Sequence, residues 1–157
     1  MKYKWLLFFL FLFWLFGYSR EFFFVQLNNI MYEKYYGHTT LPIADIMSLF
    51  NSFSYTTLYY SKYFYTLIWV ALFFLINYLA LKKLSPEKKL RRFLIYSYSI
   101  LLLLSGMSMA YGYFINNRLQ DDEYTLSRWL LGIAQSPIIC LILLASEKLY
   151  NKSFHSW

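Results

Sequence analysis

The sequence predicts an all-α fold: a polytopic membrane protein of four transmembrane helices. Of its 157 residues, 59% are hydrophobic and only 15% are charged, whereas ordinary soluble domains carry about 25% charged residues. One water-soluble core of this size cannot bury that much apolar surface. The apolar residues also gather in four long runs, and backbone in lipid must satisfy its hydrogen bonds internally, so the runs are expected to be helices. The length is that of one domain, residues 1–157.

The apolar runs place the predicted spans at about residues 5–25, 63–81, 93–114 and 126–145. The second and third contain no charge and are long enough to cross a hydrocarbon core of roughly 30 Å. The first follows a basic start, as in a signal peptide, but no small-x-small site follows it, so we expect an uncleaved helix. The fourth contains Pro137, which removes a helical hydrogen bond and usually kinks a span.

The charges predict that both termini are cytoplasmic. With the N-terminus inside, the inner segments hold ten basic and two acidic residues (+8), and the outer segments hold five basic and six acidic residues (−1). The inner excess gathers in the loop 82–92, where orientation and anionic lipid headgroups explain it, so no nucleic-acid partner is expected. Frequent Phe, Tyr, Leu, Lys and Asn is typical of an AT-rich bacterial genome, so the expected location is the bacterial cytoplasmic (inner) membrane.

The outer segment 26–62 is the one sizeable piece predicted outside the spans. A helix is expected over 41–53, because Thr40 can cap it and Pro42 suits a first turn. Apolar side chains then recur at helical spacing on one face: Ile43, Ile46, Met47, Phe50 and Phe53. This pattern predicts an amphipathic helix at the outer membrane interface, surrounded by tyrosines that favour headgroup depth.

Charged residues lie near the outer ends of the first and last spans. Arg20 and Glu21 follow the first apolar run, and Arg128 opens the last one. A charge at the edge of hydrocarbon is costly unless it is paired, so we expect an interhelical ion pair, with Glu21 as the partner of Arg128. The cluster is interpreted as a structural clamp or, alternatively, as a binding site for a polar headgroup or a partner's charge.

Polar and small residues within the spans predict helix contacts. Gln135 is expected to form a packing hydrogen bond, with Asn77 as a partner, or to contact a substrate. Small residues at four-residue spacing let helix backbones approach closely. They occur at Gly106, Ala110, Gly112, Gly132 and Ser136. This pattern does not distinguish contacts within the chain from contacts to a partner.

Catalytic constellations are missing from the sequence. A cysteine or serine nucleophile needs a nearby base, yet Cys140 lies in an apolar run and the two histidines, His38 and His155, lie in the outer loop and the cytoplasmic tail. The acidic run Asp121-Asp122-Glu123 has no second acidic motif beside it. We therefore expect no enzyme, no cofactor and no metal site.

The order of these features resembles the small exosortase-system-associated membrane proteins of Bacteroidetes. The matching stretches are Arg20-Glu21-Phe22-Phe23, Leu41-Pro42-Ile43-Ala44-Asp45, and Arg128-Trp129-Leu130-Leu131 followed by Gln135-Ser136-Pro137. The chain departs from that family in carrying one arginine rather than two before the last span. The resemblance implies a non-catalytic accessory role beside a membrane-embedded sorting protease.

The sequence leaves three functions open. The first is a non-catalytic accessory or structural subunit of a bacterial envelope protein complex, linked to protein sorting or export, with membrane lipids and other integral membrane proteins as partners. The second is a small carrier or channel, whose polar path would be lined by Arg20, Glu21, Asn77, Arg128 and Gln135. The third is a membrane enzyme, which needs His38 beside a nucleophile. Polar residues that converge on one water-filled cavity would favour the carrier, and polar residues that are buried and paired would favour the subunit.

Overall fold

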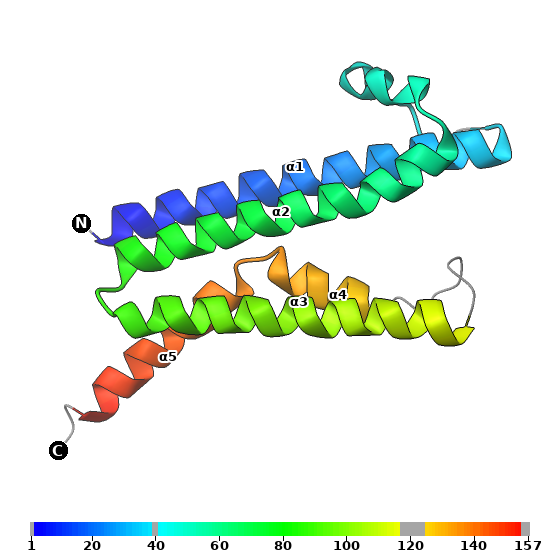
Figure 1. Ribbon diagram of the computed structural model, residues 1–157. Coiled ribbons are helices and arrows are strands. Elements are labelled where there is room, and N and C mark those ends of the chain that lie inside the picture. The colour runs from blue at the N-terminus through cyan, green and yellow to red at the C-terminus, as the bar shows by residue number, and fades with distance from the viewer. Residues whose placement is uncertain (1, 39–40, 117–124, 155–157) are drawn as a thin grey trace. The chain divides into compact units, whose positions relative to one another are not determined.

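The computed structural model describes residues 2–38, 41–116 and 125–154, and these residues contain helices and no strand (Figure 1). In chain order the elements are α1 (Lys2–Tyr36), the 3-10 helix η1 (Asp45–Ser52), α2 (Tyr55–Leu84), α3 (Lys88–Asn116), α4 (Thr125–Ala134) and α5 (Ile138–Phe154). The prediction of an all-α chain is confirmed.

Three helices, α1, α2 and α3, are long and apolar enough to cross a membrane. A fourth span exists if α4 and α5 are counted together, because they meet at a bend of 61°. The continuous helix predicted over 126–145 is therefore broken, and the kink expected at Pro137 is confirmed. At 1.5 Å per residue, the 35 residues of α1 and the 30 of α2 extend about 52 and 45 Å. Both exceed a hydrocarbon core of roughly 30 Å, so each helix is tilted or projects beyond it.

The chain divides into two compact units, the first formed by Met1–Phe13 with Leu72–Trp157 and the second by Trp14–Ala71. Helices α1 and α2 contribute to both. In the first unit, α3 packs along α4, and α5 contacts both. The buried positions of α3 include Leu94, Tyr98 and Ser105, whose spacing of four and seven residues places them on one helix face.

In the second unit, the core lies where η1 packs on α1 and α2. Its buried members are Leu27, Ile30 and Met31 of α1, Met47 of η1 and Leu58 of α2. Aromatic rings extend this core, and three of them, Phe23, Phe50 and Tyr65, contact one another edge to face at 5.0–6.0 Å between centroids.

The helix predicted over 41–53 is shorter and of the 3-10 type. The segment before it is extended, because side chains of α1 form hydrogen bonds with its backbone N–H and carbonyl groups. Asn29 donates to the carbonyl of Leu41, and the oxygen of Gln26 accepts from the N–H of Ala44 at 3.0 Å. Backbone groups bonded to α1 are not available for an α-helical turn, so helix begins only at Asp45.

Candidate functional site

The break between α4 and α5 brings polar groups together inside the first unit. Helix α4 ends at Ala134 because Pro137 has no N–H to donate to the carbonyl of Ile133. The hydroxyl of Ser136 replaces that donor, at 2.7 Å from the Ile133 oxygen. The same hydroxyl accepts from the N–H of Ile138 at 3.3 Å, where α5 begins. Ser136 thus caps the end of α4 and the start of α5.

Two neighbouring helices supply further donors to the break. Tyr98 of α3 donates its hydroxyl hydrogen to the carbonyl of Ala134 at 2.7 Å. Asn77 of α2 donates its amide to the Tyr98 hydroxyl at 2.8 Å and to the carbonyl of Ser136 at 3.2 Å. Asn77 and Tyr98 are buried, and so is Gln135 at the centre of the break. Because a carbonyl without a partner is costly in an apolar interior, these bonds stabilise the broken geometry.

One buried side-chain atom at the break is not satisfied by the described residues. The side-chain oxygen of Asn77 is buried and has no hydrogen-bond partner among them. The carbonyls of Ala134 and Ser136, by contrast, already accept from Tyr98 and Asn77. A transporter with a broken helix needs unwound carbonyls that are available to its ligand, and here two of them are occupied.

A second polar contact joins α3 to α4. The hydroxyls of Ser105 and Ser127 lie 2.7 Å apart, and both side chains are buried. Sequence reasoning selected neither residue, and it also missed Tyr98. The sequence did contain a signal for this face: Tyr98 and Ser105 are seven residues apart, so these two polar residues lie on one side of a long apolar helix.

The charged residues of the predicted cluster, together with Gln135, which was considered with them as a candidate binding residue, divide between the units. Arg20 and Glu21 lie in the second unit, whereas Arg128 and Gln135 lie in the first. Arg20 is half-buried, with its guanidinium carbon 5.8 Å from the centroid of the Phe24 ring, and its Nε has no hydrogen-bond partner among the described residues. Arg128 is exposed. The pairing of Arg128 with Glu21 stays a prediction.

Two of the small residues proposed for helix contacts, Gly106 and Ala110, lie away from the buried face of α3. Both residues are exposed, and apart from the neighbouring residues and backbone of α3 itself no described atom lies within 4 Å of the place a Cβ would take at Gly106. Gly132 of α4 also has open space there, although it is half-buried. Gly112 lies within the last turns of α3. The contacts of α3 with α4 therefore use the Tyr98–Ser105 face.

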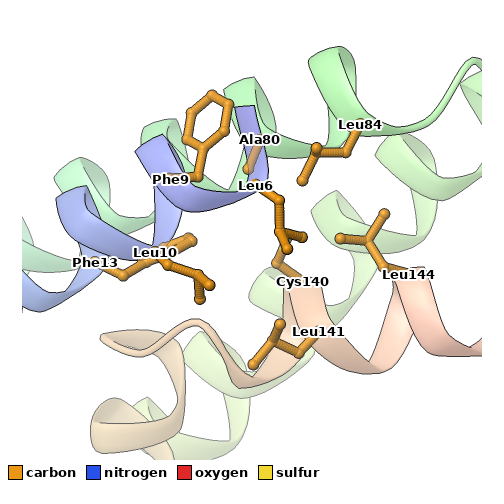
Figure 2. Close-up of a pocket in the computed structure, with 9 residues that line it drawn as sticks. All are labelled: Leu6, Phe9, Leu10, Phe13, Ala80, Leu84, Cys140, Leu141 and Leu144. Carbon is orange, nitrogen blue, oxygen red and sulfur yellow. The ribbon is translucent and has the colours of Figure 1, made fainter. Parts of the chain in front are cut away.

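Of the described groups with catalytic potential, Cys140 belongs to the first unit and His38 to the second. Cys140 is buried and lines an apolar pocket (Figure 2). His38 is exposed in the second unit, at the end of α1, where its Nδ1 lies 3.3 Å from the carbonyl of Tyr36. His155 and the run Asp121-Asp122-Glu123 lie outside the described residues. Among the residues that the structure describes, no group of three His, Cys, Asp or Glu side chains is placed to hold a metal.

Comparison with known proteins adds no relative: no protein family, no curated protein and no solved structure matches this chain.

Proposed function

We propose that the chain is a non-catalytic integral membrane protein that serves as an accessory or structural subunit of a bacterial envelope protein complex. The observation that carries this proposal is that the polar side chains at the helix break form hydrogen bonds within the chain. Buried Asn77 and Tyr98 and half-buried Ser136 donate hydrogen bonds to one another, to backbone carbonyls of the broken helix and, for Asn77, to the carbonyl of Phe73 in α2. Such bonds hold helices together and leave few groups for a substrate.

The exposed side of α3 supports a partner within the membrane. Gly106 and Ala110 are four residues apart, exposed, and flanked by the exposed side chain of Met107. Small residues let another helix approach closely, where dispersion and packing hold it. A partner in protein sorting or export agrees with the family resemblance described above, in which the sorting protease carries the chemistry.

The proposal includes an orientation in the bacterial inner membrane, with both termini cytoplasmic and η1 at the outer interface. The charge distribution supports it, and so do the exposed apolar side chains of η1, Ile46 and Leu49, which are 75% and 76% exposed. Reporter fusions test the orientation. A fusion after Lys89 is expected to read cytoplasmic and one after Tyr36 external. A cytoplasmic signal at Tyr36 would contradict the proposed topology.

Photo-crosslinking in native membranes tests the partner. A photoreactive residue at Gly106 is expected to give a discrete protein adduct, identified by mass spectrometry. The matched control is the same residue at Leu104, which is exposed on another side of α3, because two residues correspond to about 200° of helix rotation. Adducts with lipid alone at both positions would refute a partner on this face.

The alternative is a small carrier or channel, and one observation favours it: the unsatisfied side-chain oxygen of Asn77 at a broken span. This reading predicts flux of a polar solute or cation into liposomes that contain the purified protein, and loss of that flux in Asn77→Leu. Liposomes with wild-type protein that are no more permeable than empty ones would exclude it.

A further inference from the structure

Two opposite charges, Arg20 and Glu21, occupy neighbouring positions of α1 in the second unit. Ring contacts on both sides of the pair give its depth relative to α2. The centroid distances are 6.4 Å for Phe16 with Trp69 and 5.0 Å for Phe23 with Tyr65. The pair is therefore level with a part of α2 inside the uncharged run 63–81. A charged group at this depth is costly unless it is paired or reaches the membrane surface.

The surface lies close enough for the Arg20 side chain to reach it. Lys62, which donates to the side-chain oxygen of Asn28 at 2.8 Å, marks the end of the uncharged run of α2. Three to seven residues separate Lys62 from the level of Arg20, which corresponds to about 5–10 Å of helix. A long basic side chain crosses such a distance with its apolar stem in lipid and its charge at the headgroups.

The charge of Arg20 is not neutralised by a hydrogen bond at its Nε, which has no partner among the described residues. The guanidinium carbon lies 5.8 Å from the centroid of Phe24, one helical turn nearer to Asn28. Because the side chain is only half-buried, a ligand beside α1 can contact it.

The exposed face of α1 that carries Glu21 continues into the membrane as an aromatic surface. Tyr18 and Trp14 precede Glu21 by three and seven residues, so the three lie on one side of the helix. Their rings stack at 6.2 Å between centroids, and they are 66% and 65% exposed. This face therefore presents a carboxylate near the membrane surface, an arginine beside it and aromatic rings below them.

Phosphatidylethanolamine carries the complementary groups in the complementary order. Its phosphate suits Arg20, because a guanidinium offers several donors in a fork that matches phosphate oxygens. Its ammonium has N–H groups that a carboxylate such as Glu21 accepts. Its acyl chains run from the headgroup toward the centre of the bilayer, as Tyr18 and Trp14 do from Glu21.

We propose that this face of α1 binds phosphatidylethanolamine, with the phosphate beside Arg20, the ammonium beside Glu21 and an acyl chain along Tyr18 and Trp14. Phosphatidylglycerol would gain from Arg20 but is repelled by Glu21. Phosphatidylcholine has the same net charge as phosphatidylethanolamine, but its quaternary ammonium has no N–H to donate. The site does not depend on the proposed accessory role.

Native mass spectrometry of the purified full chain tests the site, after equilibration with equal amounts of the three lipids. The wild type is expected to retain one phosphatidylethanolamine in preference. A charge contact at a membrane surface is worth up to about fivefold in binding. Glu21→Gln should therefore lower retention of phosphatidylethanolamine by up to that factor, to the level of phosphatidylcholine. Arg20→Gln should lower retention of all three lipids, because each has a phosphate.

A second pair of adjacent charges on α1 supplies the controls. Glu33→Gln and Lys34→Gln remove the same charges 12 and 14 residues further along the helix, about 18 and 21 Å away. Both variants should retain phosphatidylethanolamine as the wild type does. Glu21 is exposed, so Glu21→Gln is expected to fold even if Arg20→Gln does not.

Equal retention of the three lipids by the wild type would overturn the proposal. So would equal effects of Glu21→Gln and Glu33→Gln, which would place the bound lipid elsewhere on the protein. A preference for phosphatidylethanolamine that appears only in Arg128→Gln would show that Glu21 pairs with Arg128 instead, and this outcome also overturns the lipid site.

Discussion

Removal of the Tyr98 hydroxyl measures how much the broken span depends on side chains from its neighbours. Tyr98→Phe deletes two hydrogen bonds at once: the one donated to Ala134 at 2.7 Å and the one accepted from Asn77 at 2.8 Å. The ring stays, so packing is nearly unchanged. Hydrogen bonds between membrane helices are worth about 0.6 kcal/mol on average and reach about 1.7 kcal/mol. The expected loss in the free energy of unfolding is therefore about 1–3 kcal/mol.

The assay is unfolding in mixed micelles by titration with sodium dodecyl sulfate, followed by circular dichroism. Tyr96→Phe is the matched control, because it removes the same hydroxyl from an exposed position of α3. Its free energy of unfolding should change by less than about 0.5 kcal/mol. Equal and small losses for the two variants would refute the argument that Tyr98 holds the break.

A double-mutant cycle separates the shared bond from the others. Asn77→Ala also loses the contact to the carbonyl of Ser136 at 3.2 Å. Because Asn77→Ala and Tyr98→Phe both remove the same bond between the two side chains, the double variant should lose less than the sum of the single losses. Strict additivity would show that the two side chains do not interact in the membrane.

Three further predictions concern the second unit and the thiol. Met47→Ala should destabilise the folded protein by about 2–5 kcal/mol in the same titration, because Met47 is buried between α1 and α2, whereas Ile46→Ala at an exposed site should stay within about 0.5 kcal/mol. Asn29→Ala should speed proteolysis of the segment 41–44, because the side chain of Asn29 bonds to the backbone of Leu41. Asn28→Ala is the control, because Asn28 bonds to Lys62 instead and its loss should not change the rate. Equal rates for the two variants would contradict this role of Asn29. Cys140 is buried, so a water-soluble maleimide should label it slowly in membranes and fully after unfolding; fast labelling in membranes would show that this part of α5 is open to water.

The membrane spans could be predicted from sequence because they depend on local composition. An apolar run of about 20 residues must be helical in lipid whatever surrounds it, so α2 and α3 follow from their own residues. The position of the bend at Pro137 is local in the same way, because the missing N–H of proline marks where the helix ends. The sequence also located a helix in the first apolar run, although α1 extends to Tyr36, beyond the predicted limit of residue 25.

The tertiary structure decided which helix faces pack against one another and which backbone groups bond to side chains. Small-residue spacing pointed to Gly106 and Ala110 on α3, yet the face that packs carries Tyr98 and Ser105. All sides of a transmembrane helix are apolar, so hydropathy does not show which side packs against another helix. Only the contact with α4 identifies the packed side of α3.

The same limit applies to the segment 41–53. Its side-chain pattern favours a helix, but its first residues are extended because Gln26 and Asn29, more than ten residues away in sequence, bond to their backbone. Helix propensity depends on residues that are close in sequence, whereas the hydrogen bonds of Gln26 and Asn29 come from residues that are close only in the folded protein. The sequence by itself determined where the chain becomes helical in a membrane, and the tertiary structure decided what each helix holds, because hydrogen-bond partners distant in sequence meet only after folding.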